Sequence, residues 1–162
     1  MTTPAHALAH QVLDRAKARG VMVATAESCT GGLVIAALTE IAGSSAVMDR
    51  GFVTYTNEAK QDLLGVQPET LERFGAVSSQ TAAEMAAGAL ARSQAQLAVS
   101  ITGIAGPGGG SAGKPVGLVW FGLAQASRDT RTLARRFGDV GRGKVRALSV
   151  ETALTLLRDA LR

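Results

Sequence analysis

Residues Val21 to Gly43 read VMVATAESCTGGLVIAALTEIAG and join three kinds of segment in one continuous run. The first six residues are apolar and rich in valine, which is typical of a short buried strand. A polar turn with two glycines follows, and the apolar segment behind it has the spacing of a helix that ends at Gly43. A strand that passes through a turn into a helix is the repeating unit of α/β proteins, so this run indicates the fold class.

The rest of the chain repeats this alternation. We expect strands over residues 21–26, 48–57, 97–102, 116–126 and 130–137, and helices over residues 2–20, 32–43, 58–65, 68–75, 78–94 and 144–162. Only residues 127–129 separate the last two strands, which are therefore expected to form an antiparallel hairpin. The pattern predicts one three-layer α/β/α domain over residues 1–162, with a mixed and mostly parallel sheet.

Length and composition indicate a globular protein. A chain of 162 residues suits one domain, and 46% hydrophobic with 19% charged residues argues against disorder. Cys29 is the single cysteine, so no internal disulfide can form. The N-terminal segment lacks the regions of a secretory signal, and no apolar run approaches the roughly 18 residues of a membrane span. These features predict a cytoplasmic protein without a membrane partner.

The charge of the chain does not by itself identify what the protein binds. The net charge is +4, and the basic residues gather mainly between Arg128 and Arg146. The chain has one Trp, one Tyr and four Phe, so aromatic platforms for stacked bases are scarce and nucleic-acid binding is disfavoured. A cationic site for a small phosphorylated ligand and a solvated basic surface both account for the charge.

Three expected strands end in segments rich in hydroxyl side chains or glycines. These segments are residues 27–32, 55–60 and 102–114. In α/β sheets, ligands bind at the carboxyl ends of the strands. The three segments are therefore the candidates for a binding site.

Ser28, in the first of these segments, allows two interpretations. A serine between a strand and a helix lies where free backbone N–H groups can stabilise an oxyanion, and the two glycines that follow let a substrate approach closely. The alternative is a helix N-cap, for which serine is also preferred. Cys29 is intrinsically the better nucleophile, but neither His6 nor His10 is placed to activate it, so a Cys–His site is not expected.

A serine nucleophile also needs a base, and without histidine the options are lysine, tyrosine or a carboxylate. Lys60 would have to be kept neutral by burial or by nearby positive charge. Tyr55 could relay a proton, and Glu27 is either a base or a residue that favours the start of the helix. The alternative for Lys60 is an exposed lysine on a helix. The residues alone leave these alternatives open.

The glycine-rich loop over residues 103–115 matches neither a Walker A loop nor a dinucleotide-binding fingerprint. Its backbone N–H groups are able to cradle a phosphate or an oxyanion, and a flexible lid or surface excursion is the alternative. Two histidines and one cysteine, without clustered spacing, predict no metal site.

Four motifs occur in the chain in a fixed order: TAESCTGG (25–32), IAGSSAVMDRGFVTYTNEAK (41–60), GAVSSQTAAEMAAGAL (75–90) and SITGIAGPGGGSAGKPVGLVWF (100–121). Together they closely resemble the CinA C-terminal domain family, the nicotinamide mononucleotide deamidases. The resemblance runs from about Leu13 to the final helix. The chain resembles the stand-alone form of this domain and has no room for the larger N-terminal domain of full-length CinA proteins.

The resemblance implies hydrolysis of nicotinamide mononucleotide to nicotinic acid mononucleotide and ammonia, with no metal or organic cofactor. It places the family's serine on Ser28, its tyrosine on Tyr55, its lysine on Lys60 and its Ser/Thr position on Thr102. Ser28 is then the nucleophile and Lys60 the base, while Thr102 orients the lysine or carries a proton. Substrate contacts are expected from Glu27, Thr30, Gly31, Gly32, Gly103, Gly106, Gly108, Arg142 and Arg146.

The segment before the last helix departs from the family. Relatives usually have Gly-Asp-Arg there, whereas this chain has FGDVGRGKVR over residues 137–146, with an apparent insertion of one residue. Arg142 and Arg146 are the expected counterparts of the family's arginine. The resemblance also implies a homo-oligomer, with a dimer as the expected assembly.

Two other classes of function stay open. The domain could bind a nucleotide without turning it over, as a regulatory or partner module. It could also be a competence- or DNA-damage-associated protein that acts on nucleic acid, since the family name derives from a competence-inducible operon. Weak, steeply salt-dependent DNA binding without amidase activity would favour that second reading.

Overall fold

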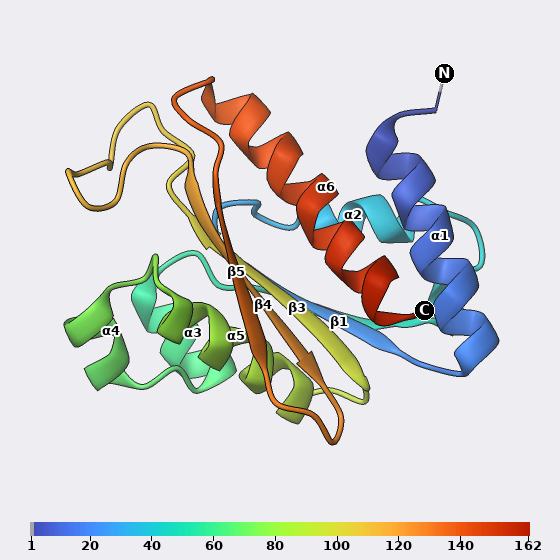
Figure 1. The fold of residues 1–162 in the computed structure, drawn as a ribbon. Coiled ribbons are helices and arrows are strands. Elements are labelled where there is room, and N and C mark those ends of the chain that lie inside the picture. Colours follow the sequence, from blue (N-terminus) through green and yellow to red (C-terminus); the bar gives the residue numbers. More distant parts are fainter. Residues whose placement is uncertain (1) are drawn as a thin grey trace.

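The computed structural model describes residues 2–162 (Figure 1). Its strands are β1 (Val23–Glu27), β2 (Met48–Val53), β3 (Leu97–Gly103), β4 (Leu118–Gln125) and β5 (Arg131–Arg136). Over the described residues they form one five-stranded sheet with the order β2-β1-β3-β4-β5. β1 pairs in parallel with β2 and β3, whereas β4 is antiparallel to β3 and to β5. Among the described strands, β4 therefore runs opposite to the rest, and the predicted mixed, mostly parallel sheet is confirmed.

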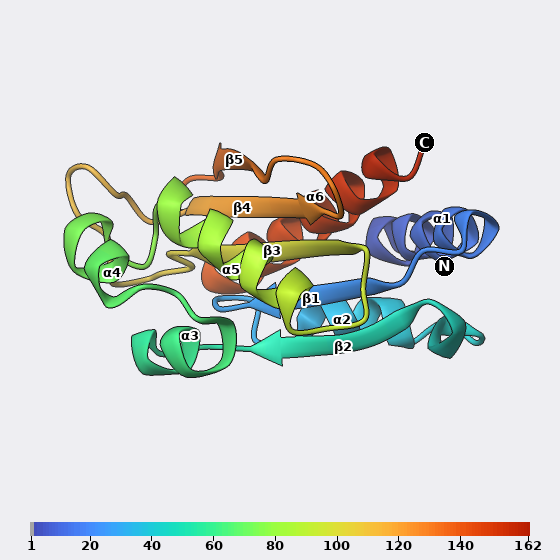
Figure 2. The same cartoon turned by 90° about the horizontal axis from the view of Figure 1, so that it is seen from below.

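The helices cover both faces of the sheet (Figure 2). On one face, α1 (Pro4–Arg19), α2 (Leu33–Thr39) and α6 (Arg142–Ala160) pack together and against the strands. On the other face, α5 (Ser79–Ala91) contacts the sheet, and α3 (Asn57–Leu64) and α4 (Pro68–Phe74) pack on α5. The prediction of a three-layer α/β/α fold is confirmed. No helix within residues 2–162 has both the length and the apolar character needed to cross a membrane.

Local capping signals explain both ends of α1 and the start of α5. The Thr3 side chain accepts a hydrogen bond from the His6 N–H (3.1 Å) at the start of α1, and Gly20 ends that helix with a φ of 65°. The Ser78 side chain accepts from the Thr81 N–H (3.1 Å) at the start of α5. Each of these residues satisfies backbone groups that a helix end leaves free.

Some boundaries differ from those expected. α2 ends at Thr39 and not at Gly43, because the chain turns there into a 3-10 helix, Ser44–Ala46. β2 ends at Val53, because Thr56 leaves the sheet to cap α3 and accepts a hydrogen bond from the Ala59 N–H (3.0 Å). The last helix begins earlier than expected, directly after Gly141.

Two apolar clusters fill the space between the layers. The larger lies under α1, α2 and α6, and the smaller lies under α5. Small side chains dominate the smaller cluster, and backbones approach one another closely there. A Cβ atom at Gly88 would overlap the carbonyl oxygen of Leu64, and one at Gly122 would overlap that of Ala82.

Because Gly88 has no room for a side chain, we expect Gly88→Ala to lower the free energy of unfolding by about 2 kcal/mol, a typical cost of overpacking. Alanine is the better helix former by about 1 kcal/mol, so a loss would report packing and not helix propensity. Gly143→Ala is the matched control, because that glycine is also helical and a Cβ there meets nothing within 4 Å. Urea denaturation measures both, and unchanged stability of Gly88→Ala would contradict the close approach.

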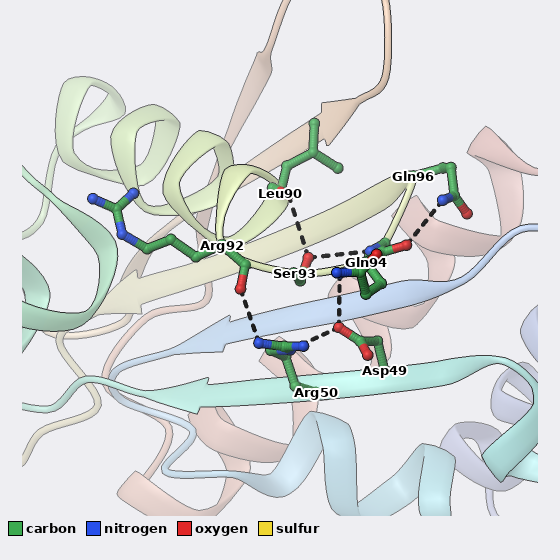
Figure 3. Close-up of polar contacts among 8 residues, drawn as sticks. Asp49, Arg50, Leu90, Arg92, Ser93, Gln94 and Gln96 are labelled. Carbon is green, nitrogen blue, oxygen red and sulfur yellow. Dashed lines mark hydrogen bonds and ion pairs between the residues drawn. The ribbon is translucent and has the colours of Figure 1, made fainter.

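A polar cluster at the amino ends of the strands ties the edge strand β2 to the loop between α5 and β3 (Figure 3). Arg50 donates to the Asp49 carboxylate (2.7 Å) and to the Arg92 carbonyl (3.1 Å), and the Gln94 N–H donates to Asp49 (2.9 Å). The Gln94 N–H and the Arg50 guanidinium hold the pKa of Asp49 below its ordinary value. The cluster fixes one end of β2, while the opposite end leads into the candidate site.

Candidate active site

The carboxyl ends of the parallel strands meet at one edge of the sheet, where the protein has a cavity of about 220 Å³. All three segments that the sequence singles out at strand ends contribute to its walls. The lining residues are Ser28, Cys29, Tyr55, Asn57, Lys60, Ala76, Val77, Thr102, Gly103, Ala105 and Arg142.

Ser28 and Lys60 form a buried pair in this cavity. Ser28 directly follows β1, and its N–H donates to the Ile101 carbonyl of the neighbouring β3 (2.9 Å). Its hydroxyl oxygen Oγ lies 2.9 Å from Nζ of Lys60. Ser28 is 8% exposed and Lys60 is 1% exposed. The alternative of an exposed helical lysine is therefore wrong.

The helix-cap interpretation of Ser28 is wrong as well. α2 begins at Leu33, and its N-cap position is Gly32. The free N–H groups of the first turn are held by Glu27, whose carboxylate accepts from Val34 (2.9 Å) and from Ile35 (3.1 Å). The Ser28 hydroxyl is thus not needed by the helix. It contacts Lys60 (2.9 Å) and donates a longer hydrogen bond to the carbonyl of Tyr55 (3.4 Å).

Lys60 is held by backbone carbonyls as well as by Ser28. It lies in the first turn of α3, where helical side chains lean back over the preceding residues. Its Nζ donates to the carbonyls of Thr54 (3.0 Å) and Tyr55 (3.1 Å). Burial lowers the pKa of Lys60 to about 8, and the nearby Cys29 acts weakly in the opposite direction.

These three contacts restrict what Lys60 can do. A backbone carbonyl only accepts hydrogen bonds, so Thr54 and Tyr55 occupy two N–H groups whether the amine is charged or neutral. The third position of Nζ faces Ser28 Oγ. In the neutral amine that position holds the lone pair, which can take the hydroxyl proton. The geometry therefore suits Lys60 as a general base for Ser28.

The cysteine and the histidines do not form a competing site. Burial raises the pKa of the Cys29 thiol to about 11, so the reactive thiolate is scarce at neutral pH. His6 and His10 lie on α1 with their rings 4.8 Å apart, and neither lines the cavity. Within residues 2–162, no group of three or more His, Cys, Asp and Glu side chains is placed to hold a metal ion.

Tyr55 and Thr102 line the cavity without a side-chain contact to the Ser28–Lys60 pair. Tyr55 is 62% exposed, and its hydroxyl accepts a hydrogen bond from Arg142 (3.4 Å). Its contribution to the pair comes through its carbonyl, which accepts from Lys60. Thr102 is buried, and its hydroxyl donates to the carbonyl of Ala76 (2.8 Å), a residue of the cavity wall. The structure thus places Thr102 against the wall, where it supports residues 76 and 77.

The turn from Glu27 to Gly32 lies beside the cavity. The Glu27 carboxylate accepts from the Thr30 hydroxyl (2.6 Å) in addition to its two backbone contacts. Gly31 and Gly32 have φ values of 58° and 106°, in the left-handed region that favours glycine. Glu27 and Thr30 are fully buried. Their polar groups are occupied by protein partners, so the expected substrate contacts from these two side chains are not supported.

The glycine-rich loop is anchored at several points. Gly103 lines the cavity, and the Gly106 carbonyl accepts from Arg142 (2.8 Å). Lys114 donates to the carbonyl of Phe74, the last residue of α4. Gly108 lies in a second hollow of about 590 Å³, which is lined mainly by glycines and prolines together with Ser111, Arg136 and Asp139. The loop is thus tied to the walls of the site, and only its first part borders the Ser28–Lys60 pair.

Arg142 and Arg146 lie one turn apart on α6 but face different partners. Arg142 lines the cavity and contacts Tyr55 and the loop. Arg146 donates to the carbonyls of Cys29 (3.1 Å) and Thr30 (3.4 Å). Both arginines have protein partners, but Arg142 is exposed at the rim of the cavity, whereas Arg146 is partly buried against the turn behind Ser28.

A family model of the CinA C-terminal domain matches residues 5–161. The chain belongs to this family. It is 51% identical over 157 residues to the nicotinamide-nucleotide amidohydrolase PncC of Enterobacter agglomerans, covering 97% of this chain and 93% of that one. It is 52% identical over 148 residues to the protein of the same name from Escherichia coli strain K12, with 90% of each chain covered. The crystal structure of the competence/damage inducible protein CihA from Agrobacterium tumefaciens superposes with a TM-score of 0.95 at 57% identity, covering 98% of this chain and 96% of that one.

In this CinA C-terminal domain, the residues implied by the sequence resemblance fall into separate groups. Ser28, Lys60, Tyr55, Thr102, Gly103 and Arg142 line the cavity, whereas Glu27, Thr30, Gly31, Gly32 and Arg146 form or hold the adjoining turn. Residues that sequence analysis missed complete the walls: Asn57, Ala76, Val77 and Ala105. All four lie inside the family motifs already noted for other residues. Ala76, Val77 and Ala105 have small or apolar side chains that carry no chemical signal of their own, and Asn57 is the first residue of α3.

Proposed function

We propose that this protein hydrolyses the amide of nicotinamide mononucleotide, giving nicotinic acid mononucleotide and ammonia. The observation that carries the proposal is the buried contact of 2.9 Å between Ser28 Oγ and Lys60 Nζ inside a cavity. A serine beside a base able to take its proton is the arrangement that covalent attack on an amide requires. The names of the relatives from Enterobacter agglomerans and Escherichia coli supply the substrate class.

In the first half of the proposed reaction, neutral Lys60 takes the Ser28 hydroxyl proton while Oγ attacks the amide carbon. A C–O bond forms, and the amide oxygen becomes an oxyanion. When the oxyanion collapses, the C–N bond breaks and Lys60 returns the proton to the departing nitrogen, which leaves as ammonia. The products are an ester of nicotinate mononucleotide on Ser28 and a neutral Lys60.

In the second half, water occupies the place that ammonia has left. Lys60 takes a proton from this water as its oxygen attacks the ester carbon. The C–O bond to Ser28 then breaks, and Lys60 returns the proton to Oγ. The enzyme regains its starting state, and the product is released as a carboxylic acid. This acid gives its remaining proton to the ammonia or to water, so the product carries a carboxylate where the substrate had an amide.

The experiment that tests the function is incubation of the pure protein with nicotinamide mononucleotide, followed by measurement of ammonia, with and without a chelator. We expect ammonia release that the chelator does not change. Nucleotide binding without ammonia release would instead favour the regulatory module considered above. We also propose that the protein is a homodimer. Light scattering coupled to size-exclusion chromatography measures its molar mass and tests this separately.

Recognition of the substrate phosphate is the next element of the proposal. The Arg142 guanidinium lies at the rim of the cavity and can donate two parallel hydrogen bonds to a phosphate. Losing a charged contact at a buried site typically costs about 2–5 kcal/mol, and the cost should lie at or below the lower end of this range for Arg142, which is exposed. Binding energy from the phosphate can also position the amide at Ser28, so its loss should lower turnover as well as affinity.

We therefore expect nicotinamide riboside, which lacks the phosphate, to react at least about tenfold less efficiently than the mononucleotide. Arg142→Ala should narrow this gap, because it weakens only the phosphorylated substrate. Lys144→Ala is the matched control, since Lys144 lies two residues further along α6, is exposed and is absent from the cavity lining. The measurement is kcat/KM for both substrates with the wild-type protein and the two variants. Equal efficiency of the wild-type protein on riboside and mononucleotide would refute phosphate recognition.

A further inference from the structure

We infer that Glu27 and Arg146 are positioning residues that hold the nucleophile turn, residues 28–32, and that neither contacts the substrate. The Glu27 carboxylate accepts hydrogen bonds from one hydroxyl of the turn and from two backbone N–H groups of α2. The Arg146 guanidinium donates to two backbone carbonyls of the turn. The inference rests on the proposed function for its kinetic test, and a second test below does not use the substrate.

The nucleophile turn has little to hold it within its own sequence. Gly31 and Gly32 adopt positive φ values of 58° and 106°, and glycine also has the most conformational freedom to leave such a geometry. α2 has seven residues, and the N-cap position, Gly32, supplies no side-chain hydrogen bond. The contact between Ser28 and Lys60 therefore depends on partners outside the turn.

Glu27 supplies the first of these partners. Its side chain is fully buried and accepts from the Thr30 hydroxyl (2.6 Å), the Val34 N–H (2.9 Å) and the Ile35 N–H (3.1 Å). Within residues 2–162, no Lys or Arg forms a salt bridge with this carboxylate. A buried carboxylate with three donors joins the turn to the first turn of α2, and its acceptor sites are directed at the protein.

Arg146 supplies the second partner from a distant part of the chain. Its Nε donates to the Cys29 carbonyl (3.1 Å) and its Nη2 to the Thr30 carbonyl (3.4 Å). A Cβ atom at Gly31 would lie 3.4 Å from Nη2, so the guanidinium packs directly against the turn. The two carbonyls belong to the residues that follow Ser28. Arg146 thus fixes the backbone that directs the Ser28 side chain toward Lys60.

Displacement of a catalytic group by about 1 Å can cost about 100-fold in rate. We expect Arg146→Ala to lower kcat by about 10- to 100-fold, with the KM for mononucleotide unchanged within about twofold. The ratio of efficiencies on mononucleotide and riboside should stay at the wild-type value. Arg142→Ala, one helical turn away, should change that ratio. Methylguanidinium should restore part of the activity of Arg146→Ala, and Arg146→Lys should retain more activity than Arg146→Ala.

Labelling of Cys29 tests the same inference without substrate. Cys29 is the single cysteine of the chain, its carbonyl is held by Arg146, and the residue is 6% exposed. An aromatic disulfide reagent should therefore modify the folded wild-type protein slowly. In Arg146→Ala and in Glu27→Gln, a looser turn should make labelling at least about tenfold faster. Lys144→Ala is the unchanged control, because Lys144 is exposed and does not line the cavity. Removal of Arg146 also removes a charge that lowers the Cys29 pKa, which would slow labelling, so an increase in Arg146→Ala reports opening of the turn. Glu27→Gln instead removes a charge that raises the Cys29 pKa and would speed labelling by itself, so Arg146→Ala is the deciding variant.

A urea denaturation curve, recorded on a separate portion of each sample, establishes that each variant is folded before it is assayed. An unchanged labelling rate in Arg146→Ala would overturn the inference for Arg146, and an unchanged rate in Glu27→Gln would overturn it for Glu27, even if the deamidase activity is established. A rise in KM for mononucleotide alone in Arg146→Ala would also overturn it, because that result assigns Arg146 to the phosphate. Absence of deamidation by the wild-type protein, together with faster labelling of the variants, would refute the proposed function. It would still support the inference that Glu27 and Arg146 position the nucleophile turn.

Discussion

Ser28→Ala is expected to lose at least about 10⁴-fold in kcat for ammonia release from nicotinamide mononucleotide, the order of effect seen when a serine hydrolase loses its nucleophile. Without Oγ, Lys60 has no hydroxyl to deprotonate, and no ester can form on the protein. The fold should be intact, because Ser28 contributes no cap to α2 and its backbone contacts remain. Ammonia release, with urea denaturation of the same samples, measures the effect.

Cys29→Ala is the matched control for this variant. The two residues are neighbours in the same turn and both line the cavity, but burial holds the pKa of the Cys29 thiol at about 11. We expect Cys29→Ala to retain most of the activity. Full activity in Ser28→Ala would exclude the covalent mechanism, and loss of activity only in Cys29→Ala would assign the nucleophile to the thiol.

Lys60→Arg is expected to lose about 10³-fold or more in kcat/KM, within the range that general-base catalysis contributes. Arginine keeps the positive charge but does not deprotonate in this pH range, so it cannot take the Ser28 proton. Lys60→Met should be equally inactive, because it removes the amine without adding charge. Near-normal turnover of Lys60→Arg would assign the base to Tyr55 or to another group.

The pH dependence of the wild-type protein should carry the signature of Lys60. Because burial lowers its pKa to about 8, kcat/KM should rise about tenfold per pH unit below that value and level off above it.

The free energy of unfolding should also depend on pH through Lys60. The unfolded chain binds more protons than the folded protein between about 8 and the ordinary lysine pKa of 10.5, so the free energy of unfolding should rise with pH across that window. Lys60→Met should lack this part of the rise.

Much of the fold could be predicted from short-range patterns. Helix α1 has a threonine cap, an early proline and a terminal glycine within its own sequence, and the structure confirms all three. The final strand pair is separated by so few residues that a hairpin is the expected connection, and β4 and β5 are antiparallel neighbours. Patterns of this kind involve residues close in sequence, so they act whatever the rest of the chain does.

The candidate site could be predicted only as a set of segments. Strand ends rich in hydroxyls and glycines indicated where a ligand could bind, and these segments do line one cavity. The resemblance to a family then singled out Ser28 and Lys60. The residues themselves left Ser28 open between a cap and a nucleophile, and Lys60 open between an exposed and a buried lysine.

Tertiary structure decided these alternatives, because each depends on partners distant in the chain. Burial gives Lys60 its lowered pKa, and two backbone carbonyls orient its amine toward Ser28, 32 residues away. Glu27, an expected base or substrate contact, is occupied by the start of α2. Arg146 reaches the Cys29 carbonyl across 117 residues. The sequence alone thus determined the helices and strands and their order, through local propensity. The charge state of Lys60 depends on desolvation, and the contacts of the site depend on short distances between segments far apart in the chain. Both arise only when the layers have packed.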